Sequence, residues 1–159
     1  DFAGAKCDAI YARTWNPKWG EFNGDTQGLV CLEFENGIKA FYEGSSVNAV
    51  GLNSWRDEYF RAECEKATVI LDHRRVERFP YDPAGKWARK REGTGEEVPL
   101  LAGSKWTNVL IIEKFIKWLD GGEPIETNVL DNLQSVALVF SAIESSRTGK
   151  PVKVQEVLK

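Results

Sequence analysis

The sequence is poor in the residues that build most metal and disulfide sites. Its 159 residues include one histidine and three cysteines, Cys7, Cys31 and Cys64, with no Cys-x-x-Cys pair among them. Structural zinc needs four Cys or His ligands at close spacing, so we expect no metal site. An odd number of widely spaced cysteines also predicts reduced thiols, which fit a cytoplasmic location better than a disulfide framework does.

Methionine and long apolar runs are missing as well. The chain begins at Asp1 and holds no methionine, whereas a translated gene product starts with one. We therefore expect a piece of a longer protein, with a further domain upstream. No apolar run approaches the roughly 20 residues of a membrane-spanning helix, and no signal peptide is visible. The sequence thus predicts no membrane partner.

Net charge is low, at −3, which argues against nucleic acid or an anionic membrane as the main partner. Basic residues do interleave with Tyr81 and Trp87 between residues 73 and 91. Acidic residues dilute that segment, however, and a solvated surface explains it better than a phosphate-binding patch.

The fingerprints of nucleotide and acyl-transfer enzymes are absent. The nearest approach to a dinucleotide motif, Gly93-Thr-Gly95, lacks a strand before it and a helix after it. There is no P-loop and no Gly-x-Ser-x-Gly elbow. The only histidine, His73, lies in a charged turn and is expected to face solvent. We therefore assign no catalytic residue and no cofactor to this chain by itself.

What the sequence does contain is a series of short strands. Hydrophobic residues make up 42% and charged residues 28%, ordinary values for one globular domain. Alternating patterns and turn signals, without intervening helices, predict an antiparallel sheet. The expected strands cover residues 7–15, 28–44 as a hairpin, 59–63, 67–71, a return through Val76 and Phe79, and a final edge strand at 152–157. Residues 80–106 are expected to be mostly loop.

Asn36-Gly37 is the strongest turn signal of the chain, because a two-residue type I′ hairpin turn needs positive φ at both positions. Such a turn would set Leu32 opposite Phe41. One apolar face of the sheet would then carry five residues that we expect at an oligomer interface: Leu29, Cys31, Ile38, Ala40 and Tyr42. The alternative is that this chain covers both faces itself.

Two helices are expected, at about 108–119 and 127–148. The second has Thr127 or Asn128 as an N-cap, Gly149 at the C-terminal end and Pro151 as a stop. Each helix has a broad apolar face that we expect to pack on the sheet. The expected buried residues are Val109, Ile112, Phe115, Ile116 and Leu119 in the first helix. In the second they are Val129, Leu130, Leu133, Val136, Ala137, Val139, Phe140 and Ile143. The predicted fold class is α+β: one open, mainly antiparallel sheet with two principal helices on one face.

Residues 120–152 carry a resemblance to a known family. The order Gly121-Gly122-x-Pro124, an apolar helix, then Ala142-Ile-Glu-Ser-Ser-Arg-Thr-Gly-Lys-Pro-Val152 resembles the C-terminal domain of the glucose–fructose oxidoreductase / inositol dehydrogenase (Gfo/Idh/MocA) family. The likeness is looser over residues 8–72, and residues 80–106 show none. It implies a dihydrodipicolinate-reductase-like domain from an NAD(P)-dependent oxidoreductase of sugars, polyols or related hydroxy compounds. It also implies a homo-oligomer contact through the sheet, and a Rossmann domain elsewhere.

The family's Glu-Lys-Pro lysine and its helix-borne histidine have no counterpart here, so the resemblance supplies no catalytic residue. By position, Asn53, Trp55 and Arg56 correspond to a loop that reaches the sugar or polyol pocket in several members. Arg13 and Trp15 form a second candidate substrate contact, with core packing or a subunit contact as alternatives. A non-catalytic self-association module remains the alternative function. A small cone-shaped isomerase or hydrolase would need a buried acid–base pair that is not evident.

Overall fold

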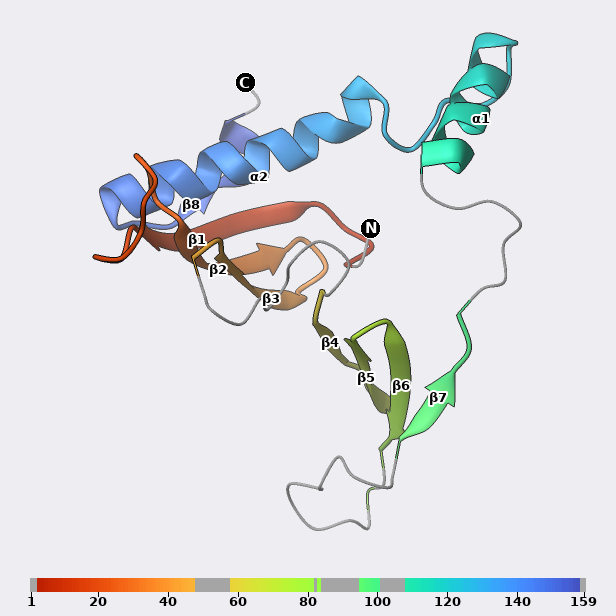
Figure 1. Cartoon of the computed structure of the whole chain (residues 1–159), viewed down its shortest axis with the longest axis horizontal. Helices are drawn as coiled ribbons and strands as arrows, with labels where there is room; N and C mark the ends of the chain where they lie inside the picture. Colours follow the sequence, from red (N-terminus) through yellow and green to blue (C-terminus); the bar gives the residue numbers. More distant parts are fainter. Residues whose placement is uncertain (1–2, 48–57, 82, 84–94, 101–107, 158–159) are drawn as a thin grey trace. The chain divides into compact units, whose positions relative to one another are not determined.

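The computed structural model describes residues 3–47, 58–81, 83, 95–100 and 108–157 of the chain (Figure 1). The chain divides into two compact units. The first holds residues 1–47 and 104–159, and the second holds residues 48–103. Helices and antiparallel sheets occupy separate stretches of sequence, so the predicted α+β class is confirmed.

The first unit contains a four-stranded antiparallel sheet in the order β3-β2-β1-β8. Its strands are β1 Cys7–Trp15, β2 Gln27–Phe34, β3 Lys39–Ser45 and β8 Val152–Lys153. The last strand is shorter than expected, because the chain turns into the 3-10 helix η1 Val154–Glu156. Val154 is completely buried there, so packing of this side chain ends the strand that alternation predicted.

The second unit contains its own antiparallel sheet, in the order β4-β5-β6-β7. Its strands are β4 Phe60–Glu63, β5 Ala67–Asp72, β6 Arg75–Pro80 and β7 Glu96–Val98. The expected single open sheet is therefore corrected to two sheets. Alternation of side chains identifies strands well, but it carries no information about which strands share a hydrogen-bonded edge.

The turn between β2 and β3 differs from the type I′ prediction. Phe34 and Ile38 close a three-residue loop through the bond from Phe34 N to Ile38 O, 2.9 Å, and Gly37 N donates to Phe34 O at 2.8 Å. Only Gly37 has a positive φ, +85°, whereas type I′ requires positive φ at Asn36 too. The Asn36 Oδ1 atom accepts from Ile38 N instead, at 3.2 Å. The extra loop residue shifts the strand register by one.

That shift changes which residues share a face of the sheet. Leu32 pairs with Ala40 and Cys31 with Phe41, instead of Leu32 with Phe41. Directly opposed residues point to the same side, so Ala40 and Tyr42 join Val30 and Leu32 on one face. Leu29 and Cys31 lie on the other face, where β1 contributes Tyr11 and Arg13. We call this second face the open face; the predicted interface residues are thus divided between the two faces.

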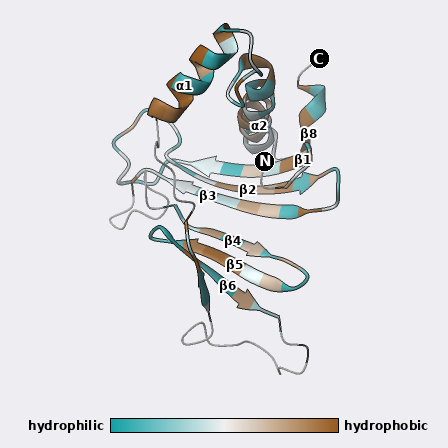
Figure 2. Ribbon diagram, turned by 90° about the vertical axis from the view of Figure 1, so that its right-hand side faces the viewer, coloured by the Kyte–Doolittle hydropathy of each residue, from teal (hydrophilic) through white to brown (hydrophobic). Residues whose placement is uncertain are grey.

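Helix α2, Val129–Thr148, begins and ends as predicted. The Asn128 Oδ1 atom accepts from Leu130 N and Asp131 N at 3.0 and 3.1 Å, which caps the first turn. Gly149 has φ 69° and its N–H bonds Ser145 O, a left-handed C-terminal cap. The helix lies over the β3-β2-β1-β8 sheet (Figures 1 and 2).

The face that α2 turns to the sheet agrees with the prediction only at Ala137. Its buried residues are Ala137, Ser141 and Ser145, one turn apart, with Leu138 and Ala142 packed at their sides. Ala137 packs with Cys7, Ile10 and Val154, and Val30, Leu32 and Phe34 border this cluster. Most of the large apolar residues expected to be buried are exposed, Phe140 by 58%. Small side chains allow the helix and the sheet to approach most closely. The packing gained in this way contributes more than burying the larger apolar area on the other side of the helix would.

Helix α1, Asn108–Leu119, also has the predicted bounds but not the predicted burial. None of its residues is buried within the described structure, and its apolar residues, shown brown in Figure 2, are at least partly exposed. A Lys114–Glu126 ion pair links it to the segment before α2. The expectation of two helices packed on one sheet face is therefore supported for α2 alone.

The hairpin of β5 and β6 has an unusual turn. Asp72 pairs with Arg75, leaving His73 and Arg74 as a two-residue loop with φ of 47° and 64°. Positive φ at both positions defines a type I′ turn, which normally carries Asn-Gly. His73 is a solvent-exposed turn residue, as predicted, with 84% of its side chain accessible and Nδ1 2.7 Å from Asp72 Oδ1. The ladder forces two ordinary side chains into left-handed backbone here.

The double substitution H73N/R74G is expected to raise the free energy of unfolding of the second unit by about 1 kcal/mol, because Asn and Gly adopt left-handed backbone more readily. Urea denaturation followed by circular dichroism measures the change. Gly37→Ala in the other hairpin, at φ +85°, is the reciprocal control and should destabilise by about 1 kcal/mol. A destabilised H73N/R74G variant would contradict the strain argument.

Candidate functional site

Arg13 and Trp15 lie on the open face near the end of β1. Their paired partners are Leu29 and Gln27, so both side chains belong to the same side of the sheet as the interface candidates Leu29 and Cys31. Trp15 is 38% exposed and is therefore not a core residue. The structure brings the second substrate candidate and part of the oligomer candidate onto one surface.

The loop after β1 is held by side-chain hydrogen bonds. The Asn16 Nδ2 group donates to Phe22 O at 2.8 Å, and Asn16 Oδ1 accepts from Thr26 Oγ1 at 2.8 Å. Thr14 Oγ1 donates to Asp25 Oδ2 at the base of the loop. Trp19 and Phe22 remain largely exposed on this braced loop. Exposed aromatic rings such as these suit the stacking of a sugar ring or an aromatic anchor of a protein contact.

Two serines of α2 complete the hydrogen bonding of β1 beyond the short strand β8. Ala12 N donates to Ser145 Oγ at 2.9 Å, and Thr14 N donates to Ser146 Oγ at 2.8 Å. Ser145 Oγ also donates to Lys150 O at 2.7 Å. Ser146 Oγ donates to Thr14 Oγ1 at 2.9 Å, because the Thr14 hydroxyl hydrogen is used by Asp25. These hydroxyls take the place of a neighbouring strand.

This arrangement explains much of the Ser145-Ser146-x-x-Gly149-Lys150 segment. Its hydroxyls join β1 to the end of α2, and Arg13 approaches the same place: its Nη1 atom would lie 3.5 Å from a Cβ placed on Gly149. Periodicity of large apolar residues did not indicate these contacts. The available signal was the stripe of small residues at Ala137, Ser141 and Ser145, which is typical of a close helix approach.

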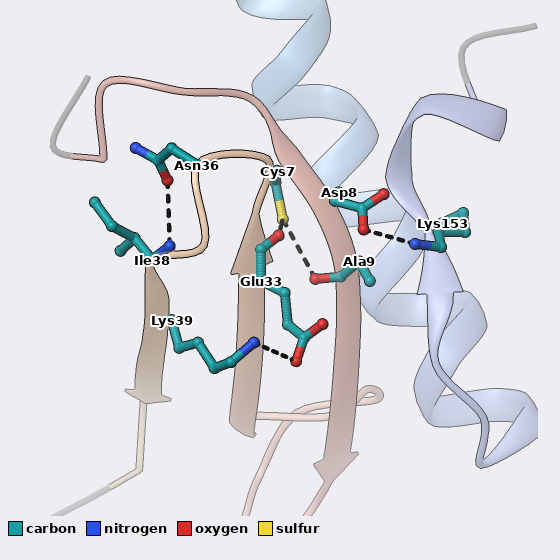
Figure 3. A network of polar contacts seen from close by, with 8 residues as sticks. All are labelled: Cys7, Asp8, Ala9, Glu33, Asn36, Ile38, Lys39 and Lys153. Atoms are coloured by element: carbon teal, nitrogen blue, oxygen red, sulfur yellow. Dashed lines mark hydrogen bonds and ion pairs between the residues drawn. The ribbon is translucent and has the colours of Figure 1, made fainter.

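The start of β1 carries a β-bulge at Asp8, between the pairs Cys7–Phe34 and Ala9–Glu33 (Figure 3). The bulge lets Cys7 and Ile10, three residues apart, both enter the core. Cys7 Sγ lies 3.4 Å from the carbonyl oxygens of Ala9 and Glu33. Burial raises the pKa of the Cys7 thiol, so it stays protonated and is a poor nucleophile.

The charged groups beside the bulge form surface pairs. Lys153 Nζ donates to Asp8 Oδ2 at 2.6 Å, and that hydrogen bond raises the pKa of Lys153 (Figure 3). Lys39 pairs with Glu33 across β2 and β3 at 2.8 Å. All three cysteines are free. Across the described ranges, no cluster of three or more His, Cys, Asp or Glu side chains could hold a metal ion.

Three sequence-predicted site residues, Asn53, Trp55 and Arg56, lie outside the described residues. Among the predicted interface residues, Leu29 and Cys31 lie on the open face, whereas Ala40 and Tyr42 are on the side of α2 and Ile38 closes the turn. Phe41, which is 86% exposed, pairs with Cys31 and lies on the open face, where the predicted register placed Tyr42. No described helix is long and apolar enough to cross a membrane.

A known protein sequence and several solved structures match nearly the whole chain. No protein-family model matches the sequence. It is 56% identical over 158 residues to "Uncharacterized protein y4oX" of Sinorhizobium fredii (strain NBRC 101917 / NGR234), covering 99% of this chain and 44% of the relative. The chain therefore spans less than half the length of that relative.

Solved structures of oxidoreductases share the fold. One is an oxidoreductase from Agrobacterium radiobacter in complex with NAD+, L-tartaric acid and magnesium. The match covers 95% of this chain and 44% of the oxidoreductase chain, with a TM-score of 0.72 and 18% sequence identity. The aldose-aldose oxidoreductase from Caulobacter crescentus complexed with glycerol matches 94% of this chain and 42% of its own, also with TM-score 0.72 and 18% identity. The chain therefore shares the fold of part of these oxidoreductases, as the resemblance over residues 120–152 led us to expect.

Proposed function

We propose that this chain is the C-terminal domain of an NAD(P)-dependent oxidoreductase of the Gfo/Idh/MocA type that acts on a sugar, a polyol or a related hydroxy compound. The match to solved oxidoreductases carries the proposal, because it covers 95% of this chain but only 44% of that chain. The nicotinamide cofactor belongs to the other part of the protein. The sequence has no Gly-rich turn between strand and helix on which a pyrophosphate could bind.

In this proposal the chain supplies a wall of the substrate pocket and no proton-transfer group. Trp15 offers an exposed ring for stacking against a sugar face, and the Arg13 guanidinium offers hydrogen-bond donors for hydroxyl oxygens. Asn53, Trp55 and Arg56 remain proposed contacts to the same substrate. Removal of hydride from a carbinol carbon then requires the cofactor and a base that the rest of the protein provides.

A dinucleotide titration tests whether the cofactor binds only to the other part of the protein. The chain by itself is expected to bind neither NAD+ nor NADP+ up to about 1 mM, the upper end of typical KM values. A fusion of the unmatched part of y4oX ahead of Asp1 is expected to bind one of them and to reduce it with an aldose, polyol or hydroxy acid. Micromolar binding by the chain alone, or a folded fusion that binds no dinucleotide, would contradict the proposal.

The same fusion tests the substrate wall. Trp15→Ala is expected to raise KM for the substrate about tenfold and to leave the Kd of the dinucleotide unchanged, because the side chain contacts only the substrate. Tyr81→Ala, which removes an exposed aromatic ring of the second unit, is the matched control. Equal effects of the two substitutions on KM would place Trp15 outside the pocket.

We also propose that the open face forms a homo-oligomer contact. Leu29 and Cys31 lie there with Tyr11 and Phe41, and the exposed apolar side chains resemble the core of a two-fold interface. In sedimentation experiments the fusion protein is expected to be a dimer or larger. L29E/F41E should give the monomer, because unpaired charges cannot be buried in the contact. A wild-type monomer at high concentration would exclude this interface.

A further inference from the structure

Five large apolar residues form a stripe along the outer side of α2, and the exposed Leu130 and Val139 lie on its two sides. The five follow one another at intervals of four, three, four and three residues: Val129, Leu133, Val136, Phe140 and Ile143. All five are exposed, between 42% and 73%. This outer stripe repeats every seven residues, which is the spacing of a seam that packs against one other helix.

The outer stripe is separate from the surface that α2 uses against the sheet. At 3.6 residues per turn its centre lies roughly 120° around the helix from the buried row of Ala137, Ser141 and Ser145. It runs for about 21 Å, almost four turns. No charged residue occurs between Asp131 and Glu144. A surface helix normally turns charged residues to water, so α2 has the composition of a helix covered on two sides.

We propose that the outer stripe of α2 is the docking surface for one apolar helix of the cofactor-binding domain of the same protein; this rests on the function proposed above. The seven-residue spacing of the stripe favours a helix as its partner over a sheet or an extended peptide. The relative y4oX and the solved oxidoreductases each have more than half of their chain outside the matched region, which provides such a partner. This contact holds the proposed substrate-binding domain against the domain that binds the dinucleotide.

The test uses the unmatched part of y4oX, expressed as a separate polypeptide and titrated into this chain by calorimetry. Wild-type chain is expected to bind it. V136Q/F140Q on the outer stripe should weaken binding at least about tenfold, because central apolar anchors dominate such interfaces. L29Q/F41Q on the open face is the matched control and should change binding by less than about twofold. Hydrogen exchange of residues 133–143 should slow when the two polypeptides are mixed.

Several outcomes would overturn the proposal. One is a wild-type chain that does not bind, and another is binding lost with L29Q/F41Q but kept with V136Q/F140Q. If the chain alone is a dimer that V136Q/F140Q dissociates, the occupant is a second copy. If V136Q/F140Q lowers the thermal stability of the isolated chain, the stripe is covered within the chain, for instance by α1.

NAD+ titration of the mixture separates this inference from the proposed function. A complex that depends on the stripe but binds no NAD+ or NADP+ would support the docking surface and contradict the oxidoreductase. A complex that binds dinucleotide and is unaffected by V136Q/F140Q would support the oxidoreductase and contradict the docking surface.

Discussion

Ser145→Ala is expected to lower the free energy of unfolding of the first unit by about 2–4 kcal/mol. The Ser145 hydroxyl is completely buried, accepts from Ala12 N and donates to Lys150 O. Alanine leaves both backbone groups without a partner, and each unsatisfied buried group costs about 1–3 kcal/mol. Urea denaturation followed by circular dichroism measures the loss, and faster hydrogen exchange at the Ala12 amide locates it.

Two other serines of α2 provide matched controls. Ser135 is exposed, so Ser135→Ala should change stability by less than about 0.5 kcal/mol. Ser141 is completely buried, and its Oγ has no hydrogen-bond partner among the described residues. Ser141→Ala therefore removes an unsatisfied hydroxyl and should be neutral or stabilising by up to about 1 kcal/mol. If Ser145→Ala proved as harmless as Ser135→Ala, the edge of β1 would not depend on the helix.

Ala137→Leu is expected to destabilise the first unit by about 1–3 kcal/mol. Ala137 is 1% exposed and packs in the cluster with Ile10 and Val154, where no space remains for three more carbon atoms. The larger side chain must push α2 away from the sheet or adopt a strained rotamer. Thermal and urea denaturation measure the loss, and NMR shifts of Ile10 report the displacement.

Val136→Leu, one residue earlier, is the matched control for Ala137→Leu. Val136 belongs to the outer stripe and is 46% exposed, so an added methylene should change stability by less than about 0.5 kcal/mol. Hydrophobic periodicity places both Val136 and Ala137 on the covered side and therefore predicts a loss from either substitution. A larger loss from Val136→Leu than from Ala137→Leu would restore the sequence-based orientation of the helix.

Local sequence signals predicted most of the elements themselves. Asn128, Gly149 and Pro151 set the ends of α2, and these signals act within a few residues. The strands up to β6 were also predicted, because alternation is a property of the strand itself. The β2–β3 register was wrong for a physical reason. Asn36-Gly37 fits both a two-residue turn and a three-residue loop, and a change of one residue moves each partner to the other face.

The candidate site was less accessible to prediction. Arg13 and Trp15 were identified from residue type alone, and the structure adds that they share the open face with Leu29 and Cys31. Ser145 and Ser146 were missed as contacts, since a serine in a helix has no preferred partner until a strand edge lies beside it.

The sequence by itself determined the helices, the short antiparallel strands, the absence of a dinucleotide fingerprint and a family likeness centred on residues 120–152. Those features depend on neighbours along the chain. Only the tertiary structure decided that the strands form two sheets, and that α2 turns its small residues to one of them and its large residues outward. The physical reason is that the close packing of a helix on a sheet depends on how well the side chains of the two surfaces fit together. Hydrophobic periodicity measures only how much apolar surface each side of the helix carries.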